Sequence, residues 1–224
     1  MPQIGGVYVE PFAGRANVFF RAASTLQFSQ WQLNDIRTAP FVNAILSHGS
    51  TIEVPQQTRE EFERQRAASQ ISDPIALLLE PYLTYSGAGY SAGYRPAKGS
   101  PLQHRYQNTL RRAHQILIQT QATITNVDWK LAIADLDEND FCYVDPPYLK
   151  ATVHGYRSDD IDHKEMINVL KNARFRWLLS EYEHPLYMEA FGEPFWRKEV
   201  QLCATNFRLS GGKAKRIECA WRNY

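Results

Sequence analysis

Short apolar segments alternate with amphipathic or polar ones along this chain, a pattern typical of an α/β protein. The apolar segments are too short for core helices and favour buried strands, whereas spacings near 3.6 residues favour helices. The predicted strands span residues 7–10, 31–33, 122–127, 141–144 and 177–180. The predicted helices span residues 17–23, 58–70, 74–83, 102–119, 163–171 and 185–191, and closing strands are expected in 199–224 around a turn at 210–212.

The order of these elements predicts a core that is interrupted once. A strand, a tight loop, a helix and a second strand follow one another within about thirty residues, the scale of a βαβ unit. Such units build a parallel sheet that binds ligands at the carboxyl ends of its strands. Residues 86–100 are rich in Gly and small residues, which predicts a mobile loop. We expect a core of residues 1–52 and 120–224 with a helical and Gly-rich insert at 53–119.

Composition narrows the class of protein. The chain has 224 residues, 44% of them hydrophobic, and a net charge of +1, which argues against a histone-like polycation or an acidic disordered tail. Its longest aliphatic run, residues 75–79, is too short to span a bilayer, and no targeting segment is visible. The odd, widely spaced set Cys142, Cys203 and Cys219 rules out a disulfide framework. These features predict a cytoplasmic protein with no membrane partner.

The tetrad Asp145-Pro146-Pro147-Tyr148 is the most informative motif. It follows a predicted strand directly, and neither proline has an amide hydrogen with which to continue a sheet. The backbone must therefore turn outward at the carboxyl end of the strand. An acidic side chain, a free carbonyl and an aromatic ring then lie together at the ligand edge. Taken alone, the tetrad is equally typical of a strand-terminating turn with a packed tyrosine.

The first predicted strand ends in a second motif, Val9-Glu10-Pro11-Phe12-Ala13-Gly14. It lacks the Gly-x-Gly-x-x-Gly spacing of dinucleotide-binding proteins. Asp35 follows the second strand, where an acidic residue can accept hydrogen bonds from ribose hydroxyls or cap a helix. The six histidines show no His-Glu-x-x-His spacing, so no metal site is expected. Ser180 has no nucleophile-elbow context.

Taken together and in this order, these motifs resemble the Dam-like family of DNA adenine-N6 methyltransferases. The resemblance is carried by Tyr8-Val9-Glu10-Pro11-Phe12-Ala13-Gly14, Leu33-Asn34-Asp35 and Tyr143-Val144-Asp145-Pro146-Pro147-Tyr148. Later segments, Leu179-Ser180-Glu181-Tyr182 and residues 216–224, are similar to that family's closing strands. The resemblance implies a Rossmann-like, S-adenosylmethionine-dependent methyltransferase core with a mostly parallel sheet. It also implies double-stranded DNA as partner and target, with methyl transfer to adenine N6.

The resemblance also implies roles for individual residues. The catalytic residues are Asp145, Pro146, Pro147 and Tyr148: Asp145 and the Pro146 carbonyl accept hydrogen bonds from the amine of a flipped-out adenine, and Tyr148 stacks on the base. S-adenosylmethionine binds over the loop of the first strand, with Asp35 at its ribose and Asp128 near its adenine. The implied cofactor-binding residues are Pro11, Phe12, Gly14, Asp35, Asp128 and Asp145, and no metal is required.

A local excess of positive charge is a candidate for DNA binding. No acidic residue lies between Glu80 and Asp128, although the whole chain is nearly neutral. A loop followed by a basic helix suits phosphates and groove edges. The predicted DNA-binding residues are Tyr90, Tyr94, Arg95, Lys98, Arg105, Arg111 and Arg112. The alternative is a solvated helix face beside a disordered loop.

The chain departs from the family pattern at two places near its start. The family's Trp-x-Gly-Gly-Lys segment is not found in residues 1–6, so it is lost, lies upstream or is replaced. The second loop glycine is also replaced, in Gly14-Arg15-Ala16-Asn17, and Arg15 is a candidate for the cofactor carboxylate or a surface arginine. A non-catalytic DNA-binding relative and an RNA adenine-N6 methyltransferase therefore remain as alternatives. The target sequence, a partner restriction enzyme, a phage context and the oligomeric state are left open.

Overall fold

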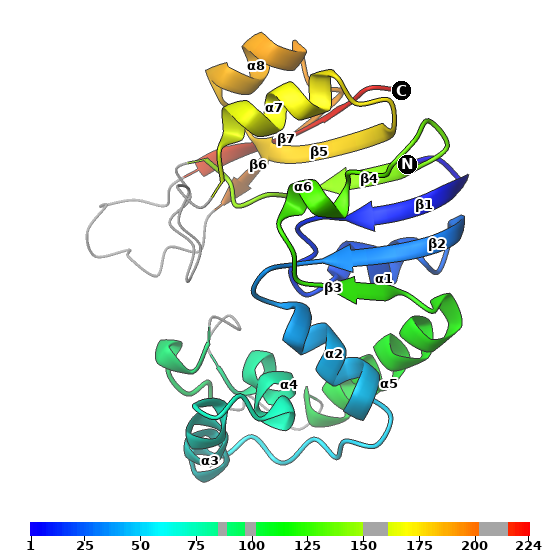
Figure 1. Ribbon diagram of the computed structural model, residues 1–224. Helices are drawn as coiled ribbons and strands as arrows, with labels where there is room; N and C mark the ends of the chain where they lie inside the picture. Colours follow the sequence, from blue (N-terminus) through cyan, green and yellow to red (C-terminus); the bar gives the residue numbers. More distant parts are fainter. Residues whose placement is uncertain (85–88, 97–101, 150–160, 202–214) are drawn as a thin grey trace.

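A seven-stranded sheet organises the described part of the protein (Figure 1). The computed structural model describes residues 1–84, 89–96, 102–149, 161–201 and 215–224. The strand order is β3-β2-β1-β4-β5-β7-β6, with β1 to β5 parallel and β7 antiparallel to both of its neighbours. The strands are β1 (Ile4–Glu10), β2 (Gln27–Asn34), β3 (Thr123–Thr125), β4 (Phe141–Val144), β5 (Arg176–Tyr182), β6 (Trp196–Gln201) and β7 (Lys215–Arg222). The prediction of an α/β fold with a mostly parallel sheet is confirmed.

Helices cover both faces of this sheet, which makes three layers. The helices are α1 (Asn17–Ala22), α2 (Ala39–His48), α3 (Arg59–Ser69), α4 (Pro74–Leu83), η2 (Tyr90–Ala92), α5 (Leu102–Thr120), α6 (Trp129–Ala132), α7 (His163–Lys171) and α8 (Pro185–Phe191). Helices α1, α2 and α5 contribute to one hydrophobic cluster, and α6, α7 and α8 contribute to a second one. Alternation along the strands explains the two clusters. On β4, Phe141 belongs to the first cluster, and Cys142 and Val144 belong to the second.

Most predicted elements are found close to their predicted places. The bounds of β4, α7 and α8 agree with the prediction, whereas β1, β2 and β5 are longer. Helices α2 and α6 were not predicted, because one follows the polar residues after β2 and the other is a single turn. The closing strands are β6 and β7. The turn predicted at 210–212 lies outside the described residues.

The prediction of a mobile Gly-rich loop is wrong for its described part, residues 89–96. The Tyr90 hydroxyl donates to the carbonyl of Ala76 at 2.7 Å, and the Tyr94 hydroxyl donates to that of Gln57 at 2.7 Å. Both tyrosine rings pack against Phe62, with centroids 5.7 and 5.8 Å away. The aromatic side chains between the glycines therefore order this turn.

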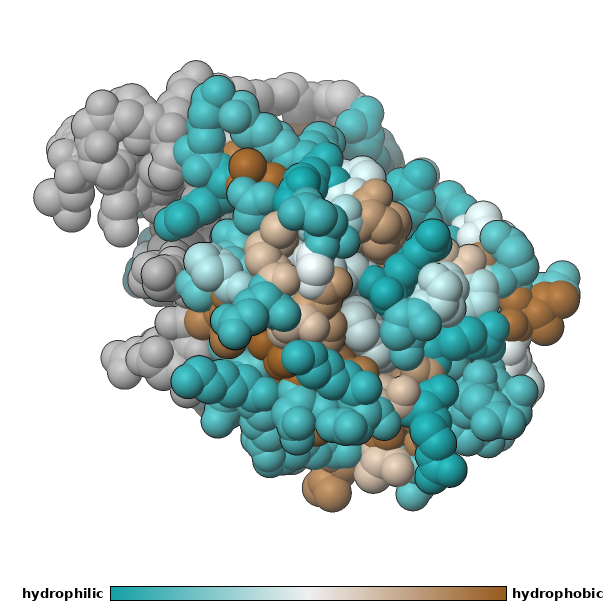
Figure 2. All heavy atoms as spheres, turned by 90° about the horizontal axis from the view of Figure 1, so that it is seen from above, coloured by the Kyte–Doolittle hydropathy of each residue, from teal (hydrophilic) through white to brown (hydrophobic). Residues whose placement is uncertain are grey.

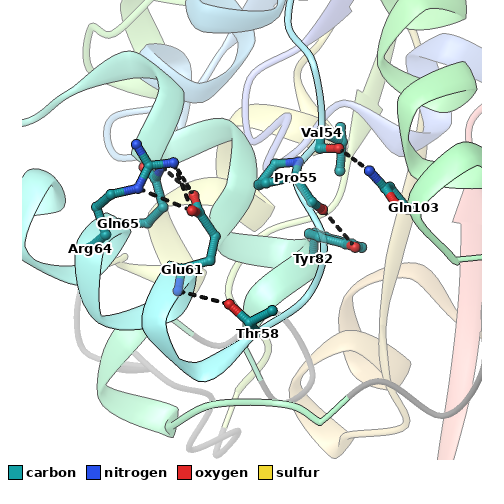
Figure 3. Close-up of polar contacts among 8 residues, drawn as sticks. All are labelled: Val54, Pro55, Thr58, Glu61, Arg64, Gln65, Tyr82 and Gln103. Carbon is teal, nitrogen blue, oxygen red and sulfur yellow. Dashed lines mark hydrogen bonds and ion pairs between the residues drawn. The ribbon is translucent and has the colours of Figure 1, made fainter.

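Side chains hold the extended backbone that leads into the insert (Figure 3). Gln103 donates to the carbonyl of Val54 at 2.6 Å, and the Tyr82 hydroxyl donates to that of Pro55 at 3.1 Å. Thr58 caps α3 by accepting the backbone N–H of Glu61 at 3.1 Å. These contacts join α3, α4 and α5 into one packed unit.

The surface seen from above is mainly hydrophilic, with small separate apolar groups (Figure 2). Among the described helices, none is both long and apolar enough to cross a membrane.

Candidate functional site

A cleft of about 730 Å³ opens where the order of the strands reverses, at the carboxyl ends of β1, β2 and β4. In open α/β sheets this switch point is the usual place for a ligand. The cleft is lined by Glu10, Pro11, Phe12, Ala13, Gly14, Arg15, Asn17, Val18, Asn34, Asp35, Ile36, Arg37, Val127, Asp128, Trp129, Tyr143, Asp145, Pro146, Pro147, Tyr148, Ile161 and Tyr182.

The loop after β1 is tied to the end of β2. Gly14 has a φ of 53°, which favours glycine, and its N–H donates to the carboxylate of Asp35 at 2.9 Å. The other oxygen of Asp35 accepts the N–H groups of Arg37 and Thr38, both at 2.8 Å. The Asn34 amide donates to the carbonyl of Pro11 at 3.0 Å. Asp35 therefore shapes both loops that border this part of the cleft.

Glu10 lies beneath the loop and is almost completely buried. Burial raises the pKa of Glu10 to about 8, and the nearby Asp145 carboxylate also raises it. The Tyr8 hydroxyl donates to Glu10 at 2.6 Å and opposes that rise. Near neutral pH the side chain of Glu10 is therefore largely protonated.

We expect Glu10→Gln to flatten the dependence of stability on pH. Between the unfolded pKa near 4.5 and the folded pKa of about 8, the folded state keeps a proton that the unfolded chain releases. Glu10 therefore makes the free energy of unfolding fall as pH rises through this window, by up to about 1.4 kcal/mol per pH unit. Gln mimics the neutral acid and removes this dependence. Urea unfolding of wild type and variant from pH 5 to 8.5 measures the difference, and parallel curves would contradict it.

Asp145 lies at the carboxyl end of β4 and is held from the neighbouring strand β5. Ser180 Oγ donates to Asp145 Oδ1 at 2.8 Å, and the Tyr143 hydroxyl lies 3.2 Å from Ser180 Oγ. Burial raises the pKa of Asp145, while the hydrogen bond from Ser180 lowers it. One oxygen of Asp145, Oδ1, is thus held from β5 at the edge of the cleft.

Tyr148 is positioned by two residues of the last strands. Its ring lies edge-on to Tyr182, with centroids 4.7 Å apart and planes at 84°. Its hydroxyl donates to Glu218 Oε1 at 3.3 Å. The antiparallel register of β5 and β7 pairs Tyr182 with Glu218, which explains why both reach the same ring.

The structure brings all predicted catalytic and cofactor-binding residues to this one cleft. Asp128 is exposed there and also caps α6 by accepting the N–H of Lys130 at 2.9 Å. Several apolar or aromatic lining residues were not among the predicted site residues: Ala13, Val18, Ile36, Val127, Trp129, Tyr143, Ile161 and Tyr182. Of these, Ile36 is 67% exposed. The position of Ile36 directly after Asp35 could have indicated it. Trp129 follows Asp128 directly. Tyr182 belongs to the segment Leu179-Ser180-Glu181-Tyr182, which the resemblance included without giving Tyr182 a role in the site.

Arg15 forms an ion pair with Glu80 of α4, at 2.8 Å, and its guanidinium lies over the ring of Phe41. From the sequence, Arg15 was a candidate for the cofactor carboxylate or a surface arginine. In this structure it connects the loop of the first strand to the insert.

The predicted DNA-binding residues do not form one surface. Tyr90 is only 8% exposed, which corrects the expectation that it contacts bases: its ring and hydroxyl pack the insert. Tyr94 is half-buried, with its hydroxyl bonded to Gln57, whereas Arg95 is exposed. Lys98 lies outside the described residues.

The three arginines of α5 are exposed, but the helix leads away from the cleft. It begins beside α4, where the Tyr106 hydroxyl donates to the carbonyl of Leu78 at 2.6 Å, and ends near the amino end of β3, opposite the carboxyl ends of the strands (Figure 1). Arg105 lies in its first turn, beside α4. Arg111 and Arg112 lie half-way along it.

No group of three or more His, Cys, Asp or Glu side chains suited to a metal ion occurs within the described part of the chain.

An open, mostly parallel sheet, covered by helices on both faces and with a cleft at its switch point, defines an α/β protein of the ligand- or cofactor-binding class. The profile of a family described as "D12 class N6 adenine-specific DNA methyltransferase" matches residues 1–192. The chain therefore belongs to this family and is a methyltransferase by family. The broader prediction is thus confirmed, while the Dam-like subgroup stays a prediction.

Solved structures with a similar arrangement have low sequence identity and low TM-scores. A conserved hypothetical protein from Streptococcus pyogenes is 12% identical, with 98% of this chain and 88% of that chain covered and a TM-score of 0.36. A human methyltransferase 10 domain-containing protein is 9% identical, with coverages of 99% and 73% and a TM-score of 0.36. The N-terminal domain of human METTL16, in complex with SAH, is 10% identical, with coverages of 96% and 60% and a TM-score of 0.35. Among curated proteins, none matches the sequence.

Proposed function

We propose that this protein transfers a methyl group from S-adenosylmethionine to the N6 amino group of adenine in double-stranded DNA. The observation that carries the proposal is the common cleft of two motifs that lie about 130 residues apart. The loop Pro11–Gly14 and the tetrad Asp145–Tyr148 line the same cavity. The family supports adenine and DNA as substrate.

The cleft has the mixed lining that a nucleoside-like cofactor needs. Phe12, Ile36 and Trp129 supply apolar surface, and the rings of Phe12 and Trp129 lie 5.9 Å apart. The carboxylates of Asp35 and Asp128 border the same space and are acceptors for ribose hydroxyls and for an adenine amino group. When bound, S-adenosylmethionine would supply an electrophilic methyl group on a sulfonium.

The residues of this chain would act on the amine. The lone pair of an exocyclic adenine nitrogen is delocalised into the ring, so the nitrogen is a poor nucleophile. Asp145 and the carbonyl of Pro146 would accept hydrogen bonds from its two N–H groups, which favours a tetrahedral nitrogen and stabilises the positive charge that develops on it. Tyr148 stacks on the base after it leaves the duplex and offsets part of the cost of flipping. The ring of Tyr182, which lies edge-on to that of Tyr148, would form a second wall of the pocket for the base.

The experiment that tests the function is methyl transfer from labelled S-adenosylmethionine to unmethylated genomic DNA, followed by nucleoside mass spectrometry. N6-methyladenine is the expected product. Parallel reactions with RNA decide the nucleic acid, since label in RNA alone would replace the DNA substrate. No product from folded protein, together with no binding of S-adenosylmethionine by calorimetry, would favour a non-catalytic DNA-binding relative.

We expect the arginines of α5 to contribute unequally to DNA binding. Arg105 lies in the first turn of α5, beside α4, whereas Arg111 and Arg112 are farther along a helix that leads away from the cleft. Arg105→Ala should lower the slope of log affinity against log salt concentration by about one, the loss of one phosphate contact. The double variant Arg111→Ala/Arg112→Ala should leave the slope unchanged. Fluorescence anisotropy with a labelled duplex measures the slope for both variants. A larger change of slope in the double variant than in Arg105→Ala would contradict this placement.

A further inference from the structure

The hydroxyl of Ser180 lies where the proposed mechanism needs a fixed carboxylate. We propose that Ser180, supported by Tyr143, is a positioning residue that holds Asp145 in its ionised, amine-accepting orientation. This inference rests on the proposed function and extends it to two residues to which that function assigns no contact with the cofactor or the DNA. The sequence indicated no catalytic role for Ser180, because it lacks the context of a nucleophile.

The register of the sheet places Ser180 beside Asp145. Strands β4 and β5 are parallel, and Val144 pairs with Leu179. The next residue on each strand is therefore Asp145 and Ser180, respectively. Ser180 is only 7% exposed, and its Oγ lies 2.8 Å from Asp145 Oδ1. A buried hydroxyl in this place is held by the strand rather than by a flexible loop.

The direction of both hydrogen bonds follows from the chemistry of the groups. An ionised carboxylate only accepts, so Ser180 must donate its single proton to Asp145. Ser180 Oγ is then an acceptor for the Tyr143 hydroxyl, 3.2 Å away. The result is a chain from Tyr143 through Ser180 to Oδ1 of Asp145, in which each bond polarises the next. With Oδ1 held in this way, we assign Oδ2 to the amine of the target base.

This chain of hydrogen bonds opposes two effects that disfavour the negative charge on Asp145. Burial raises the pKa of Asp145, and the nearby carboxylate of Glu218 raises it further, whereas the hydroxyls of Ser180 and Tyr148 lower it. Asp145 in turn raises the pKa of Glu10 of β1 and of Glu181 and Tyr182 of β5. Ser180 is the group in this set whose removal leaves both the aromatic pocket and the acidic neighbours in place.

The test compares Ser180→Ala, Ser180→Thr and Tyr143→Phe with wild type. Ser180→Ala should lower kcat about 10-fold, the effect of one hydrogen bond to a charged group, with KM for S-adenosylmethionine unchanged. The acidic limb of its pH–kcat profile should move to higher pH, because a hydrogen bond that lowers the pKa of Asp145 is lost. Ser180→Thr keeps a hydroxyl and should restore most of kcat, and Tyr143→Phe should show a smaller loss in the same direction.

Ser29 provides a matched control, since it is an exposed strand serine whose hydroxyl donates to the carbonyl of Gly6 at 2.8 Å. Ser29→Ala should leave kcat and the pH profile as in wild type. A Ser180→Ala protein with wild-type kcat and pH profile would overturn the positioning role while leaving the proposed function intact.

A second measurement separates this proposal from the proposed function. Side-chain carboxyl ¹³C NMR follows the titration of Asp145 without turnover, and the Asp145→Asn variant identifies its signal. The midpoint of that signal should move to higher pH in Ser180→Ala. An unmoved midpoint overturns the proposal, even in a protein that transfers no methyl group.

Discussion

Asp145→Ala should reduce methyl transfer to DNA about 10²–10³-fold at saturating cofactor, the usual effect of removing one preorganised polar group from a transition state. Asp145 is the charged member of the tetrad, and it lies in the cleft with Oδ1 already held by Ser180 at 2.8 Å. Alanine leaves the amine with one acceptor instead of two, so the charge that develops on nitrogen is less stabilised. Single-turnover assays with labelled cofactor measure the chemical step directly.

A control for this prediction lies at the opposite end of the same strand. Asp137 precedes β4 at its amino end, is exposed, and accepts the backbone N–H of Asn139 at 2.8 Å. Asp137→Ala removes a carboxylate from the same region of the chain but not from the cleft. Its rate should stay within about twofold of wild type, since surface changes are usually small. Near-normal turnover in Asp145→Ala, with both variants folded by circular dichroism, would remove Asp145 from the mechanism.

The sequence predicted the parts of the fold that depend on local pattern. Strand β4 and helices α7 and α8 have strong apolar periodicity and clear boundaries, so their bounds were predicted correctly. Strand β2 begins four residues before the predicted start. The prediction missed these residues because they are largely polar, and Gln27, Ser29 and Gln30 are exposed. Pairing with β1 keeps these residues in the sheet despite their weak pattern. Tertiary pairing overrides local propensity at such positions.

Residues 89–96 show the opposite error. Their glycines predicted a mobile loop, but the intervening Tyr90 and Tyr94 pack against Phe62 and bond to distant carbonyls. Composition describes the backbone freedom of a segment and not the partners that its side chains find. The same limit applies to the arginines of α5, whose charge was visible in the sequence but whose distance from the cleft was not.

The candidate site was predictable where a motif ends a strand. Pro11, Phe12 and Gly14 follow β1, and Asp145 follows β4, so parallel pairing brings them to one edge. The supporting residues were not predictable, because their roles come from register and packing. Glu218 lies 70 residues after Tyr148 in the sequence and is brought to it by the pairing of β5 with β7.

Asp35→Ala should cost both stability and cofactor binding. The carboxylate of Asp35 accepts three backbone N–H groups, from Gly14, Arg37 and Thr38, and the side chain is 6% exposed. Alanine leaves these donors without this partner, at about 1–3 kcal/mol for each one that water does not reach. We expect the free energy of unfolding to fall by about 3 kcal/mol. Affinity for S-adenosylmethionine should fall beyond detection, because the loop of the first strand loses its anchor.

Asp128→Ala separates this anchoring role from a simple contact with the cofactor. Asp128 lines the same cleft, but it is exposed and accepts a backbone N–H from Lys130 at 2.9 Å. Loss of this helix cap should cost about 1 kcal/mol of stability. If Asp128 contacts the cofactor, its removal should weaken binding by about 10-fold without abolishing it. Urea unfolding and calorimetric titration of both variants give the comparison. Equal losses in the two variants would mean that Asp35 acts as a contact residue and that the loop keeps its shape without it.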